Sequence, residues 1–306
     1  MKRAVIVFLF VLSFILTACE HKELCFEHPH FNLLRVEFNW SRLHGHEKPQ
    51  GMRAIFFPLY DGGESWVFDF PGGEGALIEL PENDYGVICF NYDTDGIVYK
   101  NNNSYTGFTA YTPDMQLPDG KQAYATPSWL CGDHINIIEL KNSTETAVQV
   151  VTLFPETMVC RYTFEVNGIR KIERVDGVMA SLSGMSGELL MSENKLPDGL
   201  SESLLFRGEV SGDKITGEFY TFGYCQERIE PNIFKLYIKS KAGKIFMLEQ
   251  DVSKQIYAVP VLGHIGNVHI VMNVNLEITD DHASGDYPGF DIDVNDWTDI
   301  YENINF

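Results

Sequence analysis

The sequence predicts an all-β protein built from two antiparallel β-sandwiches in tandem, and three of its features support this prediction. Short segments in which apolar and polar residues alternate recur along the whole chain, as in half-buried strands. Clusters of Gly, Asp, Asn, Ser and Pro between these segments are typical of tight turns. A polar segment near the middle divides the strand-rich sequence into halves that are each long enough for one sandwich.

The clearest alternating segments lie near the two ends of the chain. Successive side chains of a strand point to opposite faces of a sheet, so alternation predicts one buried face and one exposed face. In the first segment, Arg35–Trp40, the expected buried face consists of Val36, Phe38 and Trp40. In the second, His269–Ile278, it consists of Ile270, Met272, Val274, Leu276 and Ile278.

The sequence between these segments predicts many further strands and one helix. In chain order, strands are expected at 52–59, 65–70, 76–80, 85–92, 136–140, 147–154, 159–166, 188–192, 204–210, 214–222, 234–239, 244–252 and 255–261. The helix candidate is Arg170–Leu182, in which Ile172, Val175 and Met179 can share one face and Gly177 weakens the pattern.

The polar segment Lys141–Thr146 suggests a boundary between two domains, at residues 31–144 and 145–306. The stretch Thr112–His134 is rich in Pro and Gly and is expected to form a long loop on the first domain. Long ordered loops often carry binding sites.

The N-terminus predicts export and attachment to a membrane. Lys2 and Arg3 precede an apolar segment that ends at Leu16. This segment is too short to span a bilayer, which takes roughly 20 apolar residues, but it fits a signal-peptide core of about 7–15 residues. The following Leu-Thr-Ala-Cys sequence, ending at Cys19, resembles the lipobox of bacterial lipoproteins.

That resemblance implies a signal peptide at residues 1–18 and a lipidated tether at residues 19–30, in which Cys19 carries acyl chains such as palmitate. Two or more acyl chains hold a protein stably on a membrane. Glu20 follows the cysteine in place of an inner-membrane retention Asp, which favours the outer membrane. The alternative is an ordinary cleaved signal peptide in which Cys19 has no role.

The charge and the cysteines exclude several classes of protein. The chain has 43 acidic and 23 basic residues and a net charge of −20, which disfavours binding to nucleic acid and adsorption to anionic lipid surfaces. Besides Cys19 it has five cysteines with no Cys-x-x-Cys pair, so neither a zinc ribbon nor a redox motif is indicated. Cys89 and Cys160 lie in apolar strands and are expected to be buried thiols.

Two acidic segments resemble calcium-binding loops only in part. Asn91, Asp93, Asp95 and Gly96 match positions 1, 3, 5 and 6 of such a loop, but Asn102 replaces the bidentate Glu at position 12. Solvated turn residues are the preferred interpretation of this segment.

The second segment matches the ligand positions with Asp291, Asp293, Asn295 and Glu302, but Asp296 replaces the Gly required at position 6. Neither segment is flanked by a helical pattern. No cofactor or metal site is therefore expected.

No catalytic motif stands out. In Gly184–Glu188, Glu188 takes the place of the second Gly of a nucleophile elbow. The many carboxylates do not single out a glycosidase pair. Trp66, Tyr124 and Trp129 lie in or beside expected loops, where they can stack on sugar rings or cover the ends of a sandwich.

The whole pattern resembles the two-domain fimbrillin-like lipoproteins of the Bacteroidales, particularly minor anchor and tip subunits, and a related uncharacterised two-domain lipoprotein family. The resemblance rests on the Leu-Thr-Ala-Cys motif just before the first strand and on the segments Ala76–Ile97, Val178–Met191 and Gly289–Ile300. It implies two transthyretin-like sandwiches and a role in fimbriae (pili) or cell adhesion.

The resemblance also implies assembly by strand exchange, in which an extended segment of one chain completes the sheet of another. The candidate segments are the two alternating strands at the ends of the chain, with Val36, Phe38, Trp40, Ile270, Met272, Val274 and Leu276. Stalk subunits of the family lose a strand-bearing pro-segment to an arginine-directed protease. Cleavage after Arg42 would do the same here, although the short tether favours retention of the lipidated end.

The expected function is that of a non-enzymatic, lipid-anchored protein of the outer membrane and cell surface. It would act as a minor fimbrial anchor or tip subunit or as an adhesin, with other fimbrial subunits or surface proteins as partners. The alternative is a surface lipoprotein that binds host or bacterial glycans. A β-sandwich hydrolase is a weaker third hypothesis.

Overall fold

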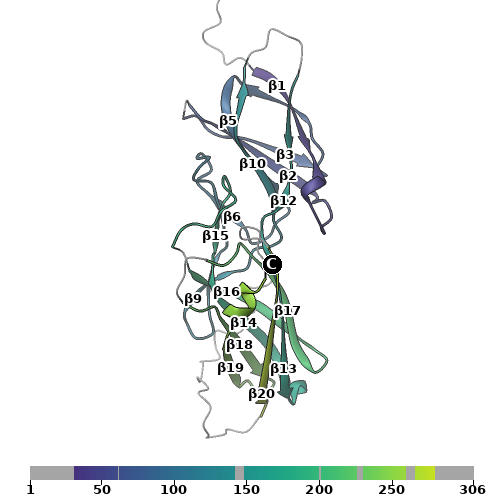
Figure 1. The fold of residues 1–306 in the computed structure, drawn as a ribbon, viewed down its shortest axis with the longest axis vertical. Coiled ribbons are helices and arrows are strands. Elements are labelled where there is room, and N and C mark those ends of the chain that lie inside the picture. The colour runs from purple at the N-terminus through teal and green to yellow at the C-terminus, as the bar shows by residue number, and fades with distance from the viewer. Residues whose placement is uncertain are drawn as a thin grey trace, which may run out of the picture.

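The computed structural model describes residues 31–60, 62–141, 148–199, 201–225, 230–259 and 266–279. Within these residues nearly all regular structure is β, which confirms the predicted all-β class. The strands form two sandwiches that follow one another along the long axis of the molecule (Figure 1). No helix of the described residues is both long and apolar enough to span a bilayer.

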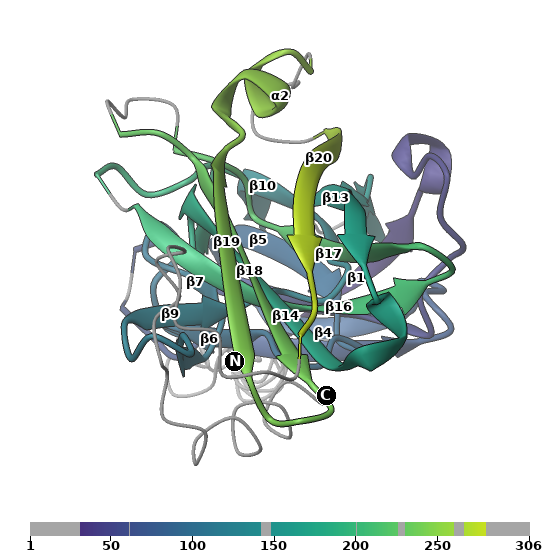
Figure 2. The ribbon, with the colours of Figure 1, turned by 90° about the horizontal axis from the view of Figure 1, so that it is seen from below.

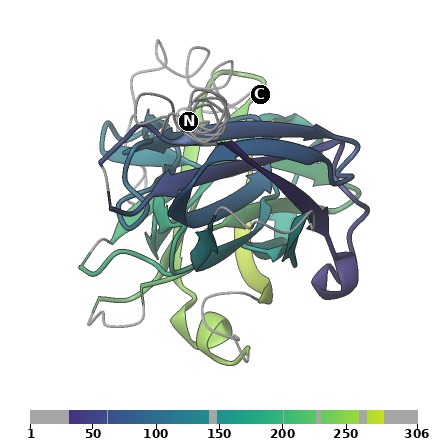
Figure 3. The same ribbon diagram turned by 90° about the horizontal axis from the view of Figure 1, so that it is seen from above.

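The first sandwich pairs a three-stranded sheet, in the order β11-β1-β4, with a five-stranded sheet, in the order β12-β10-β5-β2-β3. Their inner faces bury an apolar core that includes Leu34, Val36, Phe56 and Val87. The view from above shows β1 and its neighbours lying across the five-stranded sheet (Figure 3). The elements are β1 (Phe31–Phe38), η1 (Trp40–Arg42), β2 (Gly51–Pro58), β3 (Trp66–Pro71), β4 (Leu77–Pro81), β5 (Asn83–Asn91), β10 (Cys131–Leu140), β11 (Gln149–Leu153) and β12 (Glu156–Thr157).

A small sheet joins the two halves of the sequence. It has the order β15-β7-β6, with β6 (Val98–Lys100) and β7 (Thr109–Tyr111) from the first half and β15 (Glu188–Leu190) from the second. The core cluster beneath it combines Phe57 and Phe90 of the first sandwich with Phe108 of the connecting segment and Leu189 and Phe222 of the second half.

The second sandwich is formed by one long sheet in the order β19-β18-β14-β16-β17-β13-β20, to which β9 and β8 add beside β16. Four phenylalanines fill its centre, and the rings of Phe206 and Phe219 stack at 3.6 Å. The elements are β8 (Asp114–Gln116), β9 (Gln122–Ala125), β13 (Cys160–Arg170), η2 (Ile172–Arg174), β14 (Val175–Met185), β16 (Glu202–Ser211), β17 (Lys214–Thr221), β18 (Ile233–Ser240), β19 (Ile245–Asp251), α2 (Ser253–Tyr257) and β20 (Asn267–Glu277).

Two predictions of local structure are wrong. The segment predicted as a helix, Arg170–Leu182, forms the 3-10 turn η2 and most of β14. β14 contacts a different core cluster on each face, with Val178 in one and Met179 in the other, so most of its residues are buried and it shows no strand alternation. In the segment predicted as a strand at 255–261, residues 255–257 belong to the helix α2 instead, and residues 260 and 261 lie outside the described residues.

The predicted long loop at Thr112–His134 is also wrong in part, because it contains β8 and β9 and the start of β10. Leu204 of β16 pairs with Tyr124 of β9, which attaches this segment to the second sandwich. In the opposite sense, β11 and β12 follow residue 144 but pair with β1 and β10 of the first sandwich. The described chain therefore does not pass from one sandwich to the other at a single point, because β8 and β9 precede this position and β11 and β12 follow it.

Most strand pairs are antiparallel, but three described pairs are parallel: β1 with β11, β16 with β9, and β13 with β20. In each, strands from distant parts of the sequence lie side by side. Cys89 and Cys160 are buried, as expected, and burial raises the pKa of the Cys160 thiol to about 12.

Candidate functional site

The two candidate exchange strands occupy different positions in their sheets. β1 is an interior strand, since it pairs with β11 on one side and β4 on the other. Val36 is fully buried and Phe38 is partly buried, in line with the alternation. Trp40 lies beyond the end of β1, in η1, where its ring contacts that of Phe38 at 5.9 Å.

β20 ends its sheet, because among the described strands it pairs with β13 alone. Ile270 and Met272 are buried in the core of the second sandwich, and Val274 and Leu276 pack against that core. The predicted apolar face is therefore present. No described strand pairs with the opposite edge of β20, and this open edge can accept another strand.

Gly168 fixes how β20 lies on β13. The paired residues run without a break from Arg161 with Asn267 to Asn167 with Asn273, and then shift so that Ile169 pairs with Leu276. Gly168, at this bulge, has a φ of +88°. A Cβ there would lie 1.9 Å from the carbonyl oxygen of Val274, so the close approach requires glycine.

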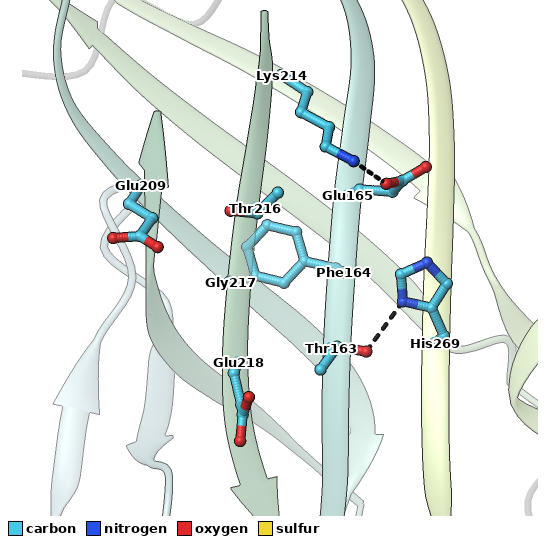
Figure 4. Close-up of a pocket in the computed structure, with 9 residues that line it drawn as sticks. All are labelled: Thr163, Phe164, Glu165, Glu209, Lys214, Thr216, Gly217, Glu218 and His269. Atoms are coloured by element: carbon cyan, nitrogen blue, oxygen red, sulfur yellow. Dashed lines mark hydrogen bonds and ion pairs between the residues drawn. The ribbon is translucent and has the colours of Figure 1, made fainter. Parts of the chain in front are cut away.

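A polar groove lies on the outer face of the same sheet, beside β20 (Figure 4). It has a volume of about 360 Å³. A Cβ at Gly217 would lie 2.3 Å from Cε1 of Phe164, so this glycine leaves room for the Phe164 ring between the strands. The lining residues come from four strands and are Thr163, Phe164, Glu165, Glu209, Lys214, Thr216, Gly217, Glu218 and His269.

The charges of the groove are paired across strands. Lys214 donates from Nζ to Oε2 of Glu165 at 2.5 Å, and Thr163 Oγ1 contacts His269 Nδ1 at 2.9 Å. Arg161 donates two hydrogen bonds to the Glu218 carboxylate, at 2.7 and 2.6 Å.

These pairs favour the ionised form of Glu165 and Glu218. The hydrogen bond from Lys214 lowers the pKa of Glu165, and the one from Arg161 lowers the pKa of Glu218. A general acid for glycoside cleavage needs a raised pKa instead. The groove can therefore hold polar groups of a ligand or partner, but its two paired carboxyls are poorly suited to acid catalysis.

Burial raises the pKa of one carboxyl outside the groove, Glu202. Its Oε2 accepts a hydrogen bond from the backbone N–H of Gly187 at 2.7 Å and ties β16 to the turn before β15. This contact gives Glu202 a structural role.

The other candidate ligands have structural partners too. Asp93 accepts hydrogen bonds from the backbone N–H of Gln50 at 2.8 Å and from Nδ2 of Asn91 at 3.0 Å, so it ties two loops together. Within the described ranges no three His, Cys, Asp or Glu residues cluster in a way that could hold a metal ion. Asp95 belongs to no such cluster either, and Cys19, Asp291 and Asp293 lie outside the described residues.

The aromatic candidates for sugar stacking mostly pack within the protein. Trp129 contacts two core clusters, and the ring of His46 stacks on it at 4.8 Å. Trp66 lies in β3 and meets Phe31 edge to face at 5.9 Å, while Tyr124 lies in β9 against the second core. These contacts favour the structural interpretation.

Arg42 lies at the end of η1 and is exposed. Its guanidinium is 5.0 Å from the centre of the Phe154 ring.

The groove was not predicted from the sequence, because its residues come from separate strands and meet only through the register of those strands.

The chain matches a protein family and a named relative. A family model described as "Domain of unknown function (DUF5119)" matches residues 18–207. A relative from Bacteroides ovatus, named "Putative fimbrium anchoring subunit Fim4B", is 25% identical over 231 residues, which cover 73% of this chain and 67% of the relative.

Two solved structures are similar to this chain in fold. A structure described as a "putative adhesin" from Bacteroides ovatus has a TM-score of 0.66 and 18% identity, and the match covers 83% of this chain and 94% of that one. The fimbrial anchor protein Mfa2 from Porphyromonas gingivalis has a TM-score of 0.50 and 15% identity, with 79% and 91% covered. At these identities the similarity shows the fold.

Proposed function

We propose that this chain, which belongs to the family described as a domain of unknown function (DUF5119), is a non-enzymatic cell-surface protein that acts as a fimbrial anchor or a related adhesin subunit. The name of the Bacteroides ovatus relative and the fold shared with a fimbrial anchor protein support this proposal. They also agree with the resemblance to Bacteroidales fimbrial proteins that the sequence suggests. Other fimbrial subunits are the proposed partners.

The proposed attachment is a lipid on Cys19, which would hold the protein at the outer membrane. The Leu-Thr-Ala-Cys motif supports it, and the family match begins one residue before this cysteine. Eleven residues lie between Cys19 and Phe31, at the start of β1, so twelve Cα–Cα steps connect the two. At about 3.3–3.6 Å per residue, this tether would keep the first sandwich within about 43 Å of the membrane surface.

The proposed mode of assembly is strand addition, and the observation that carries it is the open edge of β20. An added strand gains affinity from backbone hydrogen bonds and specificity from alternate side chains. β20 pairs on one side only, whereas release of β1 would break its pairing with both β4 and β11. We therefore place the assembly surface at β20 and expect the chain to keep β1, without cleavage after Arg42.

Substitution of the cysteine tests the attachment. Cells that express the wild type or the Cys19→Ser variant would be fed an alkyne analogue of palmitate, and the purified chains would be examined for the label. We expect the wild type to be labelled and to stay with the outer membrane. The variant should be unlabelled and released into the periplasm or medium, and Cys25→Ser is the matched control. An unlabelled wild type would disprove lipid attachment, and an N-terminus at Leu43 would show cleavage after Arg42.

A further inference from the structure

At the open edge of β20, one backbone position is hydrogen-bonded by a side chain in place of a neighbouring strand. The side chain of Gln255, in α2, donates from Nε2 to the carbonyl oxygen of Val271 at 3.0 Å. Its Oε1 accepts a hydrogen bond from the N–H of Val271 at 2.8 Å. A side-chain amide has the same donor and acceptor as a peptide group, so Gln255 bonds to Val271 as a paired strand residue would.

Gln255 is held in position by its neighbours in the chain. Val252 and Ile256 are fully buried in the core of the second sandwich. Ser253 donates its backbone N–H to Asp251 Oδ1 at 2.9 Å, which fixes the start of α2. Figure 2 shows α2 between β19 and β20, at the end of the sheet where β20 begins.

The rest of this edge lacks the residues that usually prevent strand addition. Exposed edges are commonly protected by charged residues or proline. β3 contains Asp69 and Pro71, β4 contains Glu79 and Pro81, and β19 contains Glu249 and Asp251. In contrast, β20 contains no proline, and its one charged residue, Glu277, is its last residue and is ion-paired with Lys171.

The direction of the backbone groups follows from the pairing. In a strand, the N–H and C=O of successive residues point alternately to the two sides. Val271 directs both groups at Gln255, away from β13, so His269 and Asn273 direct theirs to the same open side. Three alternate residues therefore present a continuous edge, and Gln255 occupies its middle position.

We propose that this edge is the docking site for an extended strand of a partner polypeptide, and that Gln255 is the residue which that strand displaces. The inference rests on the proposed assembly by strand addition. The incoming backbone would replace the two hydrogen bonds of Gln255 in kind and would gain new ones at His269 and Asn273. Until then, Gln255 shields the edge against unspecific pairing.

The first test measures hydrogen exchange in the full chain, purified in detergent. Gln255→Ala removes both hydrogen bonds and keeps a good helix former in α2. We expect the amide of Val271 to exchange about tenfold faster in this variant, and the amides of β14 to be unchanged as a sign of intact folding. Lys254→Ala, at an exposed position of the same helix turn, should behave as the wild type. Gln255→Asn, which is too short to reach both groups, should repeat the effect.

The second test measures binding of a fluorescent peptide with the β20 sequence, Asn267–Glu277, which offers a strand of matching length with one acidic residue at its end. We expect Gln255→Ala to bind it about tenfold more tightly than the wild type or Lys254→Ala, and a scrambled peptide not to bind. Unchanged exchange and binding in both Gln255 variants would overturn the proposal. So would slow exchange of His269 and Asn273 in the wild type, because the edge would then already be covered. Palmitate labelling tests lipid attachment in a separate experiment, so an unlabelled wild type would not change the conclusion about Gln255 and the edge of β20.

Discussion

His46 stacks on Trp129 and lies near enough to Arg161 and Glu218 of the second sandwich to be influenced by their charges. The angle between the planes of the two stacked rings is 20°. Burial lowers the pKa of His46, and Arg161 of the second sandwich lowers it further, while Glu218 acts in the opposite direction. The folded protein therefore favours the neutral ring.

This preference predicts a dependence of stability on pH. Because the folded pKa lies below the ordinary value of 6.5, the unfolded chain takes up the proton first as the pH falls. The contribution of His46 to stability should be fully present above pH 6.5 and should decline below it. Urea denaturation from pH 7.5 to 5.5 should show the wild type losing stability relative to His46→Gln. His44→Gln, in the same loop, is the control, and parallel curves for wild type and His46→Gln would contradict the prediction.

At the scale of the element, the position of β20 depends on Gly168. Alanine there would combine a strained positive φ with a contact of 1.9 Å to the oxygen of Val274. We expect Gly168→Ala to lower the free energy of unfolding by about 1–3 kcal/mol and to speed hydrogen exchange in β20. Gly212 also has a positive φ, of +65°, but has open space around it, so Gly212→Ala measures the cost of the backbone conformation alone. Equal losses in the two variants would show that the contact with Val274 is unimportant.

Strands with one buried face could be predicted from the sequence, and so could short apolar strands between turn residues, such as β2 and β5, whereas β14 could not. β1 and β20 show alternation because only one side of each faces a core. β14 is buried on both faces, and its apolar residues are equally compatible with a helix. β9 was missed because it has four residues and lies in a stretch rich in Pro and Gly. The groove and the contact between Gln255 and Val271 could not be predicted because both join residues from separate elements.

At the scale of the whole molecule, the two sandwiches share a core. Phe108 is buried in the connecting segment, and its ring lies 5.6 Å from that of Phe57 and 5.9 Å from that of Phe90. Leu189 and Phe222, from the second half of the chain, belong to the same cluster. Division of the sequence at a polar segment does not reveal such a shared core.

The shared core predicts that the protein unfolds as one cooperative unit. Calorimetry of the wild type should show a single transition, since loss of either sandwich exposes the cluster around Phe108. Phe108→Ala should cost about 3–5 kcal/mol and separate the transition into two. Val98→Ala, at an exposed position of the same small sheet, should do neither. Two transitions in the wild type would mean that the sandwiches are energetically independent.

The interior position of β1 has a mechanical consequence for a protein held by its N-terminus. Tension on the chain ahead of Phe31 would pull along β1, at right angles to its hydrogen bonds with β4. Under such shear, the bonds to β4 and β11 bear the load together and do not open one after another. The strand nearest the tether would thus resist force best in the direction in which a loaded filament would apply it.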